Sequence, residues 1–216
     1  RTTSSAASDV YKRQLLILFA FQIVAGQEEP SPPDWGIHLG YATQQAFPFN
    51  SEDYKLTQQH ILGHLRLQQY QLGGFKVDVL SELGYYFSKH QLRNKWFTTT
   101  SFFDDFPNDF QEKMLTEKNI HQLAAHLGVS LNWFINPKIA VFGYGSIGPM
   151  WTSQLTERLA AGFAFSDNIG LGVKVKYKEH FWVSCTLVIR HESNADITFP
   201  NSGHNSVGFR LGLVFN

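Results

Sequence analysis

The 216-residue chain is poor in cysteine and carries no net charge. Its single cysteine, Cys185, cannot form an intrachain disulfide, and the chain holds no cysteine-rich metal site. Its 18 Lys and Arg residues balance 18 Asp and Glu residues, so it lacks the basic excess of a nucleic-acid-binding protein. We therefore expect no nucleic-acid partner. Several histidines also lack the spacing of metal ligands, so we expect neither a metal nor a cofactor; these are His60, His64, His126 and His180.

The chain also lacks an apolar run long enough for a transmembrane helix, which needs about 20 residues. The longest run, LLILFAFQIVAGQ, begins at Leu15. Lys12 and Arg13 precede it and the small residues Ala25 and Gly26 end it. This is the layout of a cleaved secretory signal, although a run of this length also suits an amphipathic or buried strand.

From Trp35 onward, apolar and polar residues alternate with period two. In FWVSCTLVIRHES, residues 181–193, the odd positions up to Ile189 are apolar and the even positions are mixed or polar. Such alternation is typical of a strand with one apolar face. The pattern predicts eight strands, over about 36–43, 60–70, 75–88, 120–134, 138–149, 159–176, 181–193 and 205–215.

All but the first of these strands reach or exceed the roughly 9 to 11 residues that cross a bilayer, whereas strands of soluble sheets average about 5 or 6. Together with an export signal, this length favours an all-β fold, an eight-stranded antiparallel transmembrane β-barrel of the outer-membrane type. The alternative is a soluble lipocalin-like barrel, whose apolar face would point inward. We expect export to a Gram-negative outer membrane and this division of the chain: a non-native leader over 1–14, a signal peptide over 15–26, a linker over 27–34 and the barrel over 35–216.

An eight-stranded barrel has its interior filled by side chains, so a pore is not expected. Charged residues on the polar faces of the strands should pair inside the barrel; they are Arg66, Asp78, Glu82, Lys174, Arg190 and Glu192. The polar segment 90–119 should form an exposed loop that includes a helical turn.

The stretch RHESNADITFPNSGHN, residues 190–205, is an exception, because it places polar residues on the lipid-facing side of the strands. His191 and Ser193 continue the odd, lipid-facing series of their strand, and Asn205 opens the same series on the next strand. An even strand number puts both termini in the periplasm, so the loop between these strands is extracellular. Polar groups on a lipid-facing wall are costly without partners, which indicates a functional site.

These residues resemble the motif H-x-S-N followed by P-N-x-G of the PagL-like lipid A 3-O-deacylases, also described as acyloxyacyl hydrolases. The preceding FAFSDNIGLG is similar to the same family, and the resemblance covers about residues 160–216. It implies an eight-stranded outer-membrane barrel that hydrolyses an acyl ester of lipid A in lipopolysaccharide. Lipid A and outer-membrane lipids are then its expected partners. The resemblance assigns Ser193 as nucleophile and His191 as general base of a Ser-His-acid triad that needs no metal.

The same resemblance places Asn194 and Asn201 around the oxyanion hole. Our candidate donor to the oxyanion is an amide N–H, either from Asn201 or from the backbone near Gly203. Pro200 and Gly203 would shape the loop.

One departure concerns the acid of the triad, a Glu in the family, which falls on Asn205 here. An asparagine can orient a histidine but carries no charge to stabilise an imidazolium. Glu192 should point inward, whereas Asp196 in the loop is a possible substitute. The alternative to an esterase is a non-catalytic outer-membrane barrel with a structural or adhesive role. The sequence predicts no oligomeric state.

Overall fold

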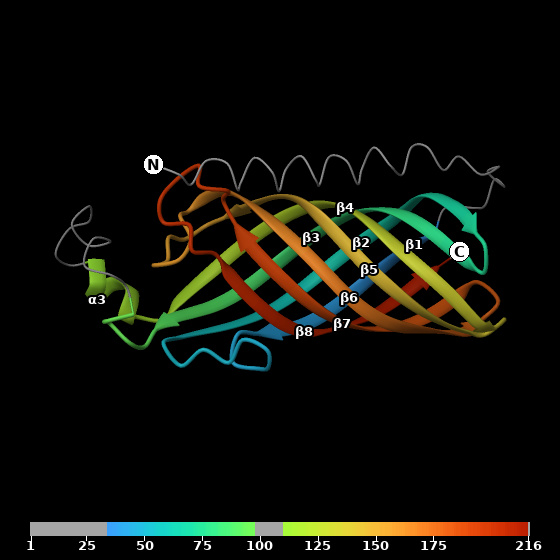
Figure 1. Ribbon diagram of the computed structural model, residues 1–216, viewed down its shortest axis with the longest axis horizontal. Helices are drawn as coiled ribbons and strands as arrows, with labels where there is room; N and C mark the ends of the chain where they lie inside the picture. Colours follow the sequence, from blue (N-terminus) through green and yellow to red (C-terminus); the bar gives the residue numbers. More distant parts are fainter. Residues whose placement is uncertain (1–33, 98–109, 216) are drawn as a thin grey trace.

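The computed structural model describes residues 34–97 and 110–215, and these form a closed β-barrel (Figure 1). The one helix in this part of the chain is α3, Phe110–Leu115. No helix among the described residues is long and apolar enough to cross a membrane. The strands, in chain order, are β1 Trp35–Thr43, β2 Tyr54–Leu72, β3 Phe75–Leu92, β4 Lys118–Asn136, β5 Ile139–Thr152, β6 Gly162–Lys178, β7 Phe181–Ser193 and β8 His204–Phe215.

Each strand pairs antiparallel with its neighbours, and β1 closes the ring by pairing with β8 from Trp35↔Phe215 to Thr43↔Val207. Closure satisfies the backbone groups that an open edge would leave unpaired, as a membrane requires. The predicted fold, an eight-stranded antiparallel barrel, is confirmed.

A membrane barrel and a soluble barrel differ in whether the apolar side chains of each strand point outward or into the lumen. The large apolar side chains point outward, with Leu83 70%, Leu171 72% and Leu187 67% exposed. The polar partners on the same strands point inward, so that Arg190 is 2% and Arg210 3% exposed. The lipocalin-like alternative, which needs an apolar lumen, is therefore wrong.

The polar interior is a network of paired side chains, as the sequence predicts. Arg190 pairs with Glu192 and stacks over the Tyr86 ring, 3.6 Å from its centroid. Arg210 donates to Tyr144 Oη, which in turn donates to Glu82 at 2.6 Å. The remaining predicted charges pair in the same way: Arg66 with Asp34 at 2.6 Å, and Lys174 with Asp78 at 3.9 Å.

β7 alone has the predicted bounds, and for β2, β3 and β6 the structure shows why the strand ends differ. β2 and β3 extend to Tyr54 and Leu92, because their added residues pair with each other and bury Tyr54, Leu56, Leu92 and Met114 in one cluster. β6 begins at Gly162, whereas the prediction began at 159, because Leu159 instead forms an isolated bridge with Asn201.

The two ends of the barrel differ in the length of their connections. Short turns such as Gly73-Gly74 join β2 to β3, β4 to β5 and β6 to β7 at one end. The long connections, including 194–203, lie with α3 at the other end (Figure 1). In outer-membrane barrels the long connections are extracellular.

Part of the predicted loop over 90–119 belongs to β3, α3 and β4, so the helical turn lies at α3. The rest of that loop, 98–109, lies outside the described residues, as do the predicted leader, signal peptide and most of the linker over 1–33.

Candidate active site

His191 and Asn205 are in register across β7 and β8, and both face outward at the long-loop end. Their side chains are joined by a hydrogen bond of 2.8 Å between His191 Nδ1 and Asn205 Oδ1. An amide oxygen only accepts, so Nδ1 is the donor, and in the neutral ring Nε2 then keeps its lone pair. The ring is thus held in the tautomer that a general base requires.

Ser193 lies two residues beyond His191 on the same outward face of β7 and is its last residue. Its hydroxyl makes no hydrogen bond within the described part of the chain. Phe165 on β6 is its cross-strand neighbour. The three predicted residues of the triad are therefore brought to one patch of the outer wall, each of them half-buried.

Gly203 lies directly against this pair of side chains. A Cβ built there would be 3.1 Å from His191 Cε1, 3.6 Å from Ser193 Cβ and 2.6 Å from the carbonyl oxygen of Glu192. Its φ of +68° is also a backbone conformation that favours glycine. Glycine at this position lets the loop close over His191 and Ser193.

Asn194 and Asn201 organise the loop that carries Gly203. The Asn194 side chain is fully buried, and its Nδ2 donates to the carbonyl oxygens of Thr198 and Pro200. The backbone N–H of Asn194 donates to Asn201 Oδ1 at 2.7 Å. The Asn194 side-chain amide thus donates to loop carbonyls, whereas the Asn201 side-chain oxygen accepts from the Asn194 backbone.

The carboxylates of Glu192 and Asp196, the two acidic residues nearest to His191 in sequence within the motif, pair with groups other than the histidine. Glu192 points into the lumen as predicted, and it accepts hydrogen bonds from Gln58, Gln122 and Arg190. Asp196 accepts a 3.0 Å hydrogen bond from Asn201 Nδ2 in the exposed part of the loop. Neither carboxylate forms a hydrogen bond or an ion pair with the His191 ring within the described residues.

A tight turn supplies backbone donors beside Ser193. Ala195 and Asp196 have φ of +55° and +61°, and the N–H of Ile197 donates to the carbonyl oxygen of Asn194 at 3.1 Å. Among the described residues, no acceptor receives the backbone N–H of Ala195 or Asp196. The N–H of Gly203, in contrast, donates to the carbonyl oxygen of Arg158 at 2.9 Å.

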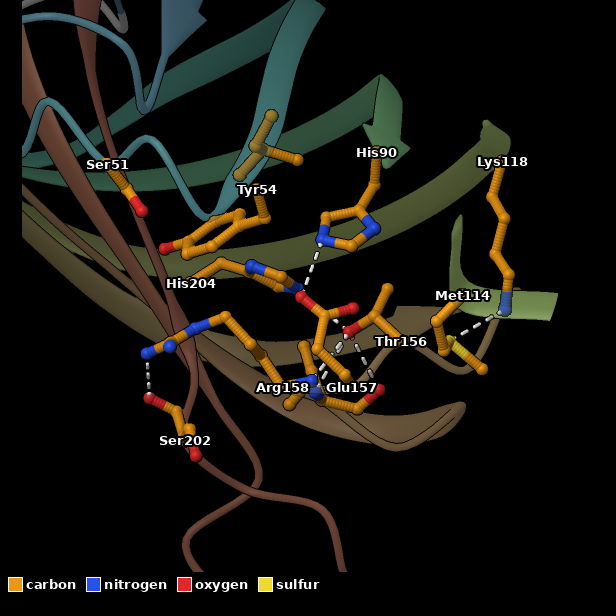
Figure 2. Close-up of polar contacts among 12 residues, drawn as sticks. Ser51, Tyr54, His90, Met114, Lys118, Thr156, Glu157, Arg158, Ser202 and His204 are labelled. Carbon is orange, nitrogen blue, oxygen red and sulfur yellow. Dashed lines mark hydrogen bonds and ion pairs between the residues drawn. The ribbon is translucent and has the colours of Figure 1, made fainter. Parts of the chain in front are cut away.

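Arg158, from the loop between β5 and β6, holds the loop between β7 and β8 by hydrogen bonds, an interaction called the Arg158 clamp below (Figure 2). Its guanidinium donates to the carbonyl oxygens of Gly203 at 2.5 Å and Ser202 at 2.9 Å. The N–H of Ala160 donates to the carbonyl oxygen of Pro200 at 2.9 Å. Sequence reasoning missed this contact, because residues about 45 positions apart meet only through the strand order.

A buried polar cluster lies on the inner side of the same loop (Figure 2). His204, next to Asn205, faces inward, and its Nε2 lies 2.9 Å from Thr156 Oγ1. His90 pairs with Glu157 at 3.1 Å, and its ring stands edge-on to His204 with centroids 5.0 Å apart. The start of β8 is therefore anchored on the inner face of the barrel wall, whereas Asn205 lies on the outer face.

A further acidic residue next to the site was also missed from sequence. Asp167 on β6 is the direct cross-strand partner of His191, on the flank opposite to Asn205. Its Oδ1 is buried and has no hydrogen-bond partner among the described residues. The segment FAFSDNIGLG contains this residue, but only strand register places it beside the histidine.

A closed ring of eight antiparallel strands, apolar outside and polar inside, defines a β-barrel of the outer-membrane type. The chain belongs to the family described as lipid A 3-O-deacylase (PagL), whose family model matches residues 38–214. The family and the barrel support an outer-membrane location. Within the described residues, no group of three or more His, Cys, Asp or Glu side chains forms a potential metal site.

A solved structure supports this fold. The crystal structure of the outer membrane enzyme PagL is similar with a TM-score of 0.54 and 16% identity, over 85% of this chain and 99% of that chain. Neisserial surface protein A matches at 8% identity and a TM-score of 0.44, over 86% of this chain and 97% of its own. The Yersinia pestis outer membrane protein Ail matches at 12% identity and a TM-score of 0.38, over 85% of this chain and 100% of its own. Comparison with curated protein sequences yields no match.

Proposed function

We propose that the protein is an outer-membrane esterase that removes an ester-linked acyl chain from lipid A of lipopolysaccharide, with Ser193 as nucleophile and His191 as general base. The observation that carries the proposal is the hydrogen bond from His191 Nδ1 to Asn205 Oδ1, 2.8 Å long. It leaves Nε2 as a base on the lipid-facing wall that also bears Ser193. Membership of a family described as lipid A 3-O-deacylase supports the substrate.

The chemistry follows from the weak nucleophilicity of a serine hydroxyl. His191 Nε2 takes the proton of Ser193 as Oγ attacks the ester carbonyl carbon, and the carbonyl oxygen becomes an oxyanion. When the tetrahedral intermediate collapses, the imidazolium gives its proton to the departing lipid alcohol. Water, deprotonated by the same nitrogen, then releases the fatty acid from Ser193.

The oxyanion needs donors that aim at the position where its charge develops. We assign this role to the backbone N–H groups of Ala195 and Asp196, which have no acceptor among the described residues, and to the side-chain amide of Asn201. During the reaction, the Asn201 amide would stop donating to Asp196 and would donate to the oxyanion instead. Asn194 and Gly203 serve by shaping the loop, since their own N–H groups are already donated.

The outer wall offers a path for the acyl chain. Pro149, Phe165 and Ser193 form one cross-strand row over β5, β6 and β7. Pro149 also lines a depression on the lipid-facing side, where small side chains leave room between larger ones such as Trp151 and Phe163. An acyl chain lying in this depression would bring its ester to Ser193 without leaving the membrane.

An extracellular site also requires export. The proposal therefore includes a signal peptide over 15–26, cleaved before the linker over 27–34 and the barrel over 35–216. Mass spectrometry of the protein extracted from outer membranes would locate the mature N-terminus near residue 27.

The decisive test is mass spectrometry of lipid A after incubation of lipopolysaccharide with the purified, folded barrel. We expect a loss equal to one acyl chain, and no loss with Ser193→Ala. Heat-dependent mobility in gel electrophoresis verifies that both proteins are folded. Unchanged lipid A with the folded wild type would instead favour the non-catalytic structural or adhesive barrel.

A further inference from the structure

We propose that Asp167 supplies, through His191, the negative charge that the triad of this chain lacks at position 205. Asp167 is then a positioning residue, and the proposal rests on the proposed esterase function. In this arrangement the two tasks of a triad acid are divided between two strands. Asn205 on β8 orients the imidazole, and Asp167 on β6 stabilises it when it becomes charged.

Strand register places the three side chains in one row. Asp167 is opposite His191 across β6 and β7, and His191 is opposite Asn205 across β7 and β8. All three face outward, since their buried neighbours Ser166, Arg190 and Ser206 face the lumen. Directly opposed side chains in an antiparallel pair have Cβ atoms about 4.5–5.5 Å apart. The carboxylate of Asp167 is therefore within electrostatic reach of the imidazole.

The contacts of Asp167 leave it available for this role. It is half-buried, and its Oδ1 is shielded from solvent without a hydrogen-bond partner among the described residues. A carboxylate at the edge of the hydrocarbon is costly unless a charge or donor compensates it. An imidazolium formed on His191 during each turnover would be that compensation.

The other charged groups near His191 are engaged elsewhere. Glu192 and Arg190 pair with each other in the lumen. Asp196 accepts from Asn201, and Arg158 donates to the carbonyl oxygens of Ser202 and Gly203. In the part of the chain that the structure describes, Asp167 is thus the carboxylate whose cross-strand partner is the histidine itself.

The first arm of the experiment removes the charge at 167 while preserving shape. We expect Asp167→Asn to lower kcat for lipid A deacylation about 100-fold with little change in KM, because a charge within about 5 Å acts on the transition state. Asp167→Glu should retain more activity than Asp167→Asn. Glu179→Gln removes an equal charge from the exposed turn before β7 and should leave the rate unchanged.

The second arm moves the charge to the other flank of the histidine. We expect the double variant Asp167→Asn with Asn205→Glu to recover at least 10-fold over Asp167→Asn alone, because either flank can hold the carboxylate. A merely structural role of Asp167 would not be rescued from β8. Full activity in folded Asp167→Asn, or a double variant no better than Asp167→Asn while Asn205→Glu alone is active, would overturn the proposal.

A substrate-independent readout separates this proposal from the function on which it rests. A fluorophosphonate labels an activated serine whatever lipid the enzyme cleaves, so the labelling rate of Ser193 should follow the same order among the variants. Labelling without lipid A cleavage in the wild type would contradict the proposed substrate but leave the role of Asp167 measurable. A folded wild type that shows neither labelling nor cleavage would remove both proposals.

Discussion

At the scale of single residues, the site depends on a neutral orienting group and on a glycine that admits close contact. The hydrogen bond from His191 to Asn205 fixes the tautomer, whereas Gly203 allows the loop to reach the backbone of Glu192. The sequence predicts both positions, because the motif spacing assigns them. It does not predict Asp167, because residues 24 positions apart become neighbours only when β6 and β7 take a particular register.

The role of Asn205 gives the first prediction. We expect Asn205→Ala to reduce kcat for lipid A deacylation about 10- to 100-fold, since His191 loses the acceptor that fixes its ring. Asn205→Glu should match or exceed the wild type, because it keeps an acceptor and adds charge. Steady-state rates with purified lipopolysaccharide check both variants. Wild-type activity in Asn205→Ala would contradict an orienting role.

Gly203 gives the second prediction. Gly203→Ala places a Cβ 2.6 Å from the Glu192 carbonyl oxygen and strains a residue whose φ is +68°. We expect a loss of about 1–3 kcal/mol in the free energy of unfolding and loss of most activity. Gly74→Ala is the matched control, because nothing lies within 4 Å of its Cβ and no positive φ is found there. Urea unfolding in detergent or liposomes measures the difference.

At the scale of elements, a strand is predicted best where apolar and polar residues alternate without interruption. β7 occupies 181–193 as predicted, because its apolar outer face is unbroken up to Ile189. The outer ends of β2 and β3, 54–59 and 89–92, lie beyond the predicted strands, since polar residues such as Gln58, Lys89 and Gln91 line these segments. The loop between β5 and β6 has no pattern of its own, and its contacts come from packing on the β7–β8 loop.

The Arg158 clamp is the prediction at this scale. Arg158→Ala leaves the carbonyl oxygens of Ser202 and Gly203 without their guanidinium donor. We expect faster proteolytic cleavage within 194–203 and about 10-fold lower deacylation, with the barrel itself intact. Arg93→Ala removes an exposed arginine from the same end and serves as control. Equal cleavage rates in the two variants would show that the clamp does not hold the loop.

At the scale of the whole molecule, stability comes from burying apolar strand faces in lipid and pairing polar groups in the lumen. Leu187, at the middle of β7, is 67% exposed on the outer wall. We expect Leu187→Arg to cost about 2–4 kcal/mol of unfolding free energy in liposomes. Glu179→Arg in the turn before β7 should cost little. Similar unfolding curves for both variants would contradict the assigned lipid-facing side.

If the protein has the proposed function, ring closure has a further consequence for when it becomes active. Asn205 belongs to β8, the final strand of the chain, which pairs with β7 on one side and with β1 on the other. Any assembly intermediate that lacks this strand holds Ser193 and His191 but leaves the imidazole unaligned. Under the proposed function, we therefore expect lipid A deacylation only after the last strand has inserted, and no activity before the barrel closes.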